Sequence, residues 1–287
     1  MDKINIYDYL KQYLNDDIIY IPNPGNAGDS LIAHATYQIL DRVGINFQEG
    51  DVNSVYEGKV VFYGGGGNLV PLYKNAYRFT EKNYSKVKKL VVLPHTILAY
   101  PDMLSALGGN VDLICRENDS YQYVTQYVTK SNVFKADDLV LELDVKKTIS
   151  DGDKIFSFND QFIYRNMKRR IRSSIYNIKN ILSNDVLNSF RSDSEKSDIA
   201  IPFANIDISQ AFATDNMSLL YSHEAAYRVF KYMERFKTIN TNRLHVCIAG
   251  TLLGKKVNFY RNSYNKNYSV YDFSLQDKYK NVTFVDN

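Results

Sequence analysis

The segment KVVFYGGGGN (residues 59–68) joins a short apolar run to four consecutive glycines. An apolar run of this length is typical of a buried β-strand, and four glycines cost so much chain entropy that a plain connection would rarely contain them. A ligand or a second backbone segment is therefore expected against this loop, with Gly65, Gly66 and Asn68 as candidate contacts.

Three further segments repeat this arrangement of a strand followed by a loop of unusual composition. The loops read PNPGNAGD, PHT and RENDS, and helix-like stretches separate the strands, which indicates βα units around a parallel sheet. Ligands bind beyond the carboxyl ends of such strands, so a site is expected there. The four predicted strands are Ile18–Ile21, Lys59–Tyr63, Lys89–Leu93 and Val111–Cys115.

The length of 287 residues favours two domains. The turn Asp151-Gly152-Asp153 suggests a boundary near residue 150, with an N-terminal α/β lobe at 1–150 and a C-terminal α/β lobe at 151–287. The predicted fold is α/β with two Rossmann-like lobes. In the second lobe the predicted strands are Lys154–Phe158, Asp198–Phe203 and Lys256–Tyr260, and the predicted helices lie around Ser218–Phe236 and Leu244–Leu253.

Composition excludes several classes of protein. A net charge of +3 is too small for a nucleic-acid binder. No stretch is long and apolar enough to span a membrane, and the N-terminal residues do not resemble a signal peptide, so a cytoplasmic location is expected. Cys115 and Cys247 sit in apolar runs and are expected to be buried, and the histidines show no zinc-ligand spacing, so no metal site is predicted.

The loop that contains Asn26, Gly28 and Asp29 leads from the first strand into a helix. Its glycines permit close approach of the backbone to an anion or a sugar, but the spacing matches neither the dinucleotide fingerprint nor the phosphate-binding loop. Asp29 fits two roles equally well, as a helix cap or as a catalytic carboxylate.

The segment TNRLH (residues 241–245) is the most specific group of candidate site residues in the sequence. Asn242 is a plausible N-cap, the start of the following helix favours an anion, and Arg243 offers a bidentate partner for carboxylate or phosphate. His245 adds a proton donor, and both side chains reach one ligand only if Arg243 lies in the turn. Among the other histidines, His34 and His95 are secondary candidates, and His223 fits an apolar helix stripe.

Together, PGNAGD, GGGGN, LICRENDS and TNRLHVCIAGTLLGKKVNFYRNSYNK resemble the polysaccharide pyruvyltransferase family, over residues about 18 to 275. The resemblance implies a fold similar to GT-B glycosyltransferases, phosphoenolpyruvate as donor, a cyclic ketal on a sugar of a cell-surface polysaccharide as product, and no metal or organic cofactor. It also implies donor binding by Arg243, Leu244 and His245, with Arg116 as a second arginine from the N-terminal lobe.

In this interpretation His245 is the general acid, and Asp29 is the base, with His95 as the alternative. Arg116 is expected at a strand end rather than in the core. Two other functions stay open: a GT-B glycosyltransferase that uses a nucleotide-sugar, and a non-catalytic module that binds sugar or phosphate.

An amphipathic, arginine-rich helix is predicted over Phe162–Leu182. Its basic face, which includes Arg169, Arg170 and Arg172, would contact anionic lipid at the cytoplasmic membrane face or a lipid-diphosphate-linked acceptor. An ordinary solvated face explains the same pattern equally well.

Overall fold

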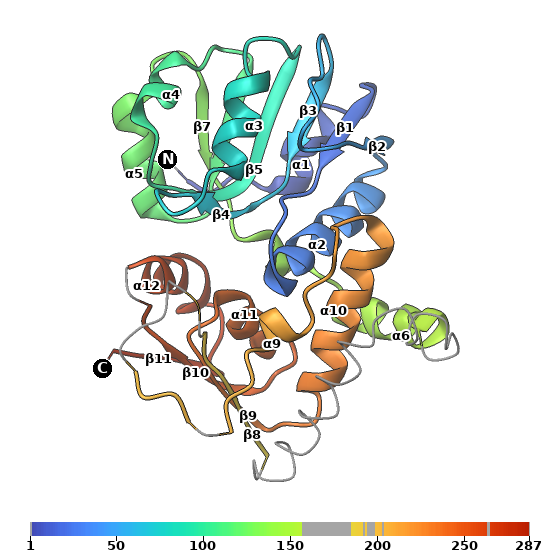
Figure 1. Cartoon of the computed structure of the whole chain (residues 1–287), viewed down its shortest axis with the longest axis vertical. Coiled ribbons are helices and arrows are strands. Elements are labelled where there is room, and N and C mark those ends of the chain that lie inside the picture. The colour runs from blue at the N-terminus through green and yellow to red at the C-terminus, as the bar shows by residue number, and fades with distance from the viewer. Residues whose placement is uncertain are drawn as a thin grey trace. The chain divides into compact units, whose positions relative to one another are not determined.

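The computed structural model describes residues 2–156, 185–191, 193, 199–202, 204–262 and 265–286. The chain divides into two compact units (Figure 1). Unit 1 contains Met1–Pro24 and Ala35–Glu142, whereas unit 2 contains Gly25–His34 and Leu143–Asn287. The loop that starts at Gly25 is thus grouped with the C-terminal half of the chain, although the residues on either side of it in sequence belong to unit 1.

Unit 1 is built on a parallel sheet with strand order β2-β1-β3-β5-β6-β7, and β4 pairs with β5 off this path. The order reverses between β1 and β3, which is where open α/β sheets bind ligands. The strands are β1 (Ile18–Ile21), β2 (Phe47–Glu49), β3 (Val60–Tyr63), β4 (Gly66–Leu69), β5 (Lys89–Ile97), β6 (Val111–Cys115) and β7 (Asn132–Lys135). The helices are α1 (Ile6–Lys11), α2 (Ala27–Val43), α3 (Asn75–Asn83), α4 (Pro101–Ala106), α5 (Asn118–Tyr127) and the 3₁₀ helix Leu139–Glu142. The first turns of α2, up to His34, are grouped with unit 2.

The central strands of unit 1 are apolar because both of their faces are covered. Every residue of β1, β3 and β6 is buried. Val61 and Tyr63 alternate with Val60 and Phe62, and the first pair packs into a core with Phe79 of α3. Near-continuous apolar runs of this kind are typical of parallel strands between two helix layers.

Unit 2 is built on a smaller parallel sheet with strand order β11-β10-β9-β8. Helix α11 packs on β9 and β10, and α10 packs on α6. The strands are β8 (Val186–Ser189), β9 (Thr238–Thr241), β10 (Lys256–Tyr260) and β11 (Val282–Val285). The helices are α6 (Val145–Phe156), α9 (Ile208–Ala211), α10 (Leu219–Met233), α11 (Leu244–Leu252) and α12 (Lys266–Val270), which continues into a π-helical turn at Tyr271–Leu275.

Most of the predicted elements are confirmed. The strands at 18–21, 111–115 and 256–260 have the predicted bounds, and the strand predicted at 59–63 starts one residue later. The helices predicted around 218–236 and 244–253 are α10 and α11. The predicted α/β class with parallel sheets is therefore correct.

Two predicted strands are wrong in the residues that the structure describes. Lys154–Phe156 ends helix α6, whose buried residues Thr148, Gly152 and Phe156 recur at steps of four, the period of a helix. Ile199–Pro202 belongs to no strand. The two edge strands of this sheet, β8 and β11, were not predicted from the sequence.

None of the described helices is long and apolar enough to cross a membrane. The predicted basic helix Phe162–Leu182 lies outside the described residues.

Candidate active site

Two arginines follow the carboxyl ends of neighbouring strands in unit 2. β8 and β9 pair in parallel with Ser189 opposite Thr241, and Arg191 and Arg243 each stand two residues beyond that pair. The Thr241 hydroxyl donates to the Ser189 carbonyl at 2.6 Å and accepts from the Arg243 backbone N–H at 2.9 Å. These bonds fix the turn after β9, and both arginines start from the same edge of the sheet.

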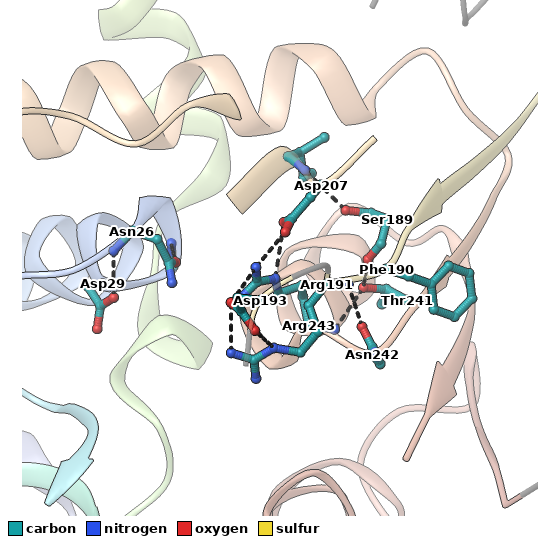
Figure 2. Close-up of polar contacts among 12 residues, drawn as sticks. Asn26, Asp29, Ser189, Phe190, Arg191, Asp193, Asp207, Thr241, Asn242 and Arg243 are labelled. Carbon is teal, nitrogen blue, oxygen red and sulfur yellow. Dashed lines mark hydrogen bonds and ion pairs between the residues drawn. The ribbon is translucent and has the colours of Figure 1, made fainter. Parts of the chain in front are cut away.

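Both guanidinium groups belong to a network with two carboxylates (Figure 2). Arg243 forms a bidentate pair with Asp207, with Nε 3.0 Å from Oδ1 and Nη2 2.5 Å from Oδ2. Asp193 accepts from Nε of Arg191 at 2.7 Å, and its Oδ2 lies 2.9 Å from Nη2 of Arg243. Arg191 and Arg243 are both buried, so the network is partly shielded from water and its interactions are stronger than on the surface. Paired guanidinium forks of this kind recognise carboxylate and phosphate groups.

His245 lies in the first turn of α11. Arg243 is the N-cap residue, with an extended backbone (φ −90°, ψ 115°), and so lies in the turn, which is the condition for the two side chains to serve one ligand. The prediction that Asn242 is the N-cap is wrong. Its Oδ1 accepts instead from the Arg191 backbone N–H at 2.8 Å. This bond connects the segment after β8 to the segment after β9.

The first turn of α2 packs against His245 within unit 2. A Cβ atom on Gly28 would lie 2.5 Å from Nδ1 of His245, so only glycine fits the observed contact. Asp29 accepts from the Asn26 backbone N–H at 2.8 Å, and Asn26 Oδ1 accepts from the Gly28 N–H at 2.8 Å. Together the two bonds cap the start of α2 in the manner of a capping box, and Figure 2 shows the bond between Asn26 and Asp29, which gives Asp29 a capping role.

Comparison with known proteins decides the family. The sequence profile of the polysaccharide pyruvyl transferase family matches residues 26–264. The chain belongs to this family. "Putative pyruvyl transferase EpsO" of Bacillus subtilis (strain 168) is 24% identical over 279 residues, which cover 88% of this chain and 83% of that protein. The crystal structure of a functional uncharacterized protein, KP1_0663 from Klebsiella pneumoniae subsp. pneumoniae NTUH-K2044, has a TM-score of 0.76 and 30% identity, and the match covers 98% of this chain and 96% of that one.

The chain is therefore a transferase, and the match does not favour the alternative of a nucleotide-sugar glycosyltransferase. Leu244, the middle residue of the Arg-Leu-His element of the transferase, is buried, whereas the His245 side chain is half-buried. Arg191 was not among the site residues predicted from the sequence. Its position after a strand-like VLNS segment, in parallel with Arg243 after TINT, is the signal that could have identified it.

Unit 1 of the transferase holds a second polar cluster, at the point where the strand order reverses. Asn23 Oδ1 accepts from the Tyr63 hydroxyl and from the Asn68 amide, each at 2.8 Å. Nε2 of His95 lies 2.9 Å from Oδ1 of Asn68. A Cβ atom on Gly66 would lie 2.6 Å from the Asn23 amide nitrogen, so the glycine run is explained in part by this close packing. Gly65 is buried in the same loop.

His95 does not lie in a loop after its strand, as predicted, but inside β5, which extends to Ile97. It pairs with Gly66 on one side and Cys115 on the other and is fully buried. The pairing between β5 and β6 shifts between Val92 and His95. Pro94, which has no N–H to donate, is accommodated at this irregularity, as expected for proline within a sheet.

The expectation that Arg116 lies outside the core is wrong. Its side chain is 0% exposed, donates to Oδ2 of Asp138 at 2.7 Å and donates to the Thr96 hydroxyl at 2.9 Å. Glu117, the next residue, caps α5 by accepting from the Ser120 N–H at 2.7 Å. The RENDS motif therefore has a structural explanation within unit 1.

The two cysteines and the two remaining histidines are buried or half-buried. Cys115 and Cys247 are buried free thiols, and burial raises the pKa of each. His223 is half-buried on α10 and stacks on His34. Within the described part of the chain, no group of three or more His, Cys, Asp or Glu residues is arranged to hold a metal ion.

Proposed function

We propose that this transferase moves a pyruvyl group from phosphoenolpyruvate to two hydroxyls of one sugar, in a cell-surface polysaccharide or its lipid-linked precursor, and forms a cyclic ketal. The observation that carries the proposal is the network of Arg191 and Arg243 beside the turn that leads to His245. The donor has both a carboxylate and a phosphate, and two arginines at neighbouring strand ends match two anionic groups on one small molecule.

The reaction needs proton transfer and charge stabilisation. Protonation of the donor methylene makes its C2 electrophilic, one sugar hydroxyl adds to C2, and the C–O bond to phosphate breaks as the second hydroxyl closes the ring. The two protons lost by the hydroxyls balance those gained by the methylene and the released phosphate. His245 is the proposed acid, because it lies in the turn after Arg243 and a histidine side chain can donate a proton to a reacting group. Arg191 and Arg243 would hold the donor and stabilise the leaving phosphate.

Asp29 is the proposed base for the sugar hydroxyl. It is half-buried, belongs to the first turn of α2, which packs against His245 through Gly28, and accepts from the Asn26 N–H through Oδ2. A carboxylate can accept at both oxygens, so capping and proton transfer are compatible. The alternative base, His95, is less well supported because it is fully buried inside β5.

Arg191 is the proposed second donor-binding arginine, because it follows the strand beside that of Arg243, whereas Arg116 is bound to Asp138 and Thr96 in unit 1. Leu244 and Asn242 would act by fixing the turn that contains Arg243. Asn26 would act by fixing the start of α2 at Gly28. Gly65, Gly66 and Asn68 are the proposed acceptor contacts, since Gly65 follows the carboxyl end of β3 and the other two lie in β4 directly after it, so the segment predicted as a loop is partly a strand.

The finer assignments of fold and location belong to the same proposal. Two separate parallel sheets support two Rossmann-like lobes of the GT-B-like class. A cytoplasmic location, a lipid-diphosphate-linked acceptor and docking of Phe162–Leu182 on the inner membrane surface rest on the sequence alone. The charge stabilisation comes from the arginines, so the proposal requires no cofactor.

The test is to incubate the protein with phosphoenolpyruvate and an oligosaccharide acceptor, and to measure phosphate release and the mass of the product. Phosphate release that depends on the acceptor, a pyruvylated product and full activity in chelator are expected. In parallel, phosphoenolpyruvate but not nucleotide-sugars should raise the thermal unfolding temperature, since a ligand stabilises the state that it binds. Sugar transfer from a nucleotide-sugar would contradict the proposal.

A further inference from the structure

The two carboxylates that contact Arg243 differ in how they are held. Asp207 faces the guanidinium side-on and makes two parallel hydrogen bonds to it. Asp193 instead bridges both arginines, because its Oδ2 lies 2.9 Å from Nη2 of Arg243 and 3.1 Å from Nη2 of Arg191. Figure 2 shows the bridging carboxylate between the two guanidinium groups.

Asp207 lies in a segment that is hydrogen-bonded to β8 on both sides of this residue. The Ile206 N–H donates to the Asn188 carbonyl at 2.9 Å, and the Ile208 N–H donates to the Ser189 hydroxyl at 3.3 Å. Asp207 is the N-cap residue of α9, yet its side chain makes no capping bond and is directed to Arg243. Its side chain is 9% exposed. A carboxylate fixed on both sides by backbone bonds can set the orientation of the guanidinium plane.

Asp193 contacts both arginines and is the more accessible carboxylate, with 29% of its side chain exposed. Its oxygens lie where a carboxylate or phosphate would lie to contact both forks. Two arginines and two aspartates balance in charge, so an added anion would leave an excess of negative charge unless one carboxylate withdrew.

We propose that Asp207 is a positioning residue that orients Arg243, and that Asp193 occupies the place of the donor's anionic group until the donor displaces it. This inference rests on the proposed function, because the displacing group is the carboxylate or phosphate of the donor. In the free protein Asp193 keeps the arginines together and excludes weaker anions. Binding then replaces one carboxylate–guanidinium contact with another.

Two chemically identical substitutions separate the roles. Asp193→Asn removes a competitor of the donor, and a partly exposed ion pair is worth up to about 1 kcal/mol, so the KM for phosphoenolpyruvate and the Kd for inorganic phosphate should each fall by about 2- to 5-fold. Asp207→Asn leaves Arg243 without its fixed partner and should lower kcat/KM by about 10-fold or more. Asp207→Glu should restore part of the activity.

Glu224→Gln is the matched control, since it breaks a different carboxylate–arginine pair of unit 2, between Glu224 and Arg228 on α10, and should leave donor KM unchanged. Thermal unfolding establishes that each variant is folded before kinetics are compared. Weaker phosphate binding in Asp193→Asn would overturn displacement, and unchanged kcat/KM in Asp207→Asn would overturn positioning. If the wild type does not turn over phosphoenolpyruvate, the proposed function fails, but phosphate affinity in the two variants still tests the inference.

Discussion

The imidazole rings of His34 and His223 stack face to face in unit 2, with centroids 4.5 Å apart and planes 3° apart. Nε2 of His34 lies 3.1 Å from the Thr148 hydroxyl, and Nε2 of His223 lies 2.9 Å from the Thr148 carbonyl. The pKa of His34 is lowered to about 3, mainly by burial and to a smaller extent by electrostatic repulsion from His223. Burial also lowers the pKa of His223. Both rings are therefore neutral in the folded protein near pH 7.

The stack predicts a loss of stability in mild acid. The unfolded chain binds a proton on His34 near pH 6.5, whereas the folded protein binds it only near pH 3, so the unfolded state holds more protons in between. The contribution of His34 is complete above pH 6.5 and is lost as pH falls towards 3. Between pH 7 and 5 the free energy of unfolding should fall by about 2 kcal/mol from this residue.

Urea unfolding of the wild type and of His34→Gln at pH 7 and 5 measures this effect. Glutamine does not titrate and can keep a hydrogen bond to Thr148. Between pH 7 and 5 the free energy of unfolding of the variant should therefore fall by about 2 kcal/mol less than that of the wild type. Comparing the variants removes the contribution of carboxylates common to both. Equal losses would mean that the stack does not control acid stability.

Gly28→Ala should reduce activity without unfolding the protein. The new Cβ atom would lie 2.5 Å from Nδ1 of His245, so the half-buried ring must move, while alanine in a helix is favoured over glycine by up to about 1 kcal/mol. A catalytic group that is displaced by about 1 Å can lose about 10²-fold in rate. Steady-state kcat and the unfolding temperature test this. Gly109→Ala is the control, since its Cβ would meet an atom at an ordinary 3.7 Å.

Arg116→Ala should unfold or strongly destabilise unit 1. It would leave Asp138, which is 1% exposed, without its buried cationic partner, and removing one member of a buried pair costs about 3–5 kcal/mol. Thermal and urea unfolding measure the loss. Lys88→Ala breaks an exposed pair with Asp16 and should change stability by less than about 1 kcal/mol. A well-folded Arg116→Ala protein with only a raised donor KM would restore this arginine to the donor site.

These cases show what the sequence can predict and what it cannot. Ile18–Ile21 was predicted with correct bounds because a continuous apolar run between turns leaves few alternatives. β8 was missed because Asn188 and Ser189 make its run polar. Arg191 was missed with it, since a side chain is recognised as a strand-end group only when the strand itself is recognised.

Burial of a charged side chain depends on partners that are distant in sequence. Arg116 and Asp138 are separated by 22 residues, and nothing in either local segment pairs them. The Arg243 contacts are longer in range, with Asp207 36 residues away. The Arg243 turn itself was predictable because it depends on the strand-to-helix junction around residues 241–245 alone.

Asp29→Asn should separate capping from proton transfer. Asparagine keeps a side-chain oxygen that can accept from the Asn26 N–H, so the capping box and the unfolding temperature should be preserved. It cannot serve as a base, and kcat should fall by about 10²-fold or more. Asp29→Ala, which removes both functions, should also lose about 1 kcal/mol of stability. Near-normal kcat in Asp29→Asn would leave Asp29 as a cap alone.

Arg243→Lys and His245→Gln should affect different kinetic constants. Lysine keeps the charge of Arg243 but cannot pair side-on with Asp207 and the donor, so the KM for phosphoenolpyruvate should rise more than kcat falls. Glutamine at 245 retains hydrogen bonding but cannot deliver a proton, so kcat should fall by about 10²-fold or more with little change in donor affinity. Steady-state kinetics and phosphate binding distinguish the two. If His245→Gln keeps its kcat and loses donor affinity, His245 is a phosphate ligand, because a lost proton donor would slow the chemical step and leave binding of the ground state intact.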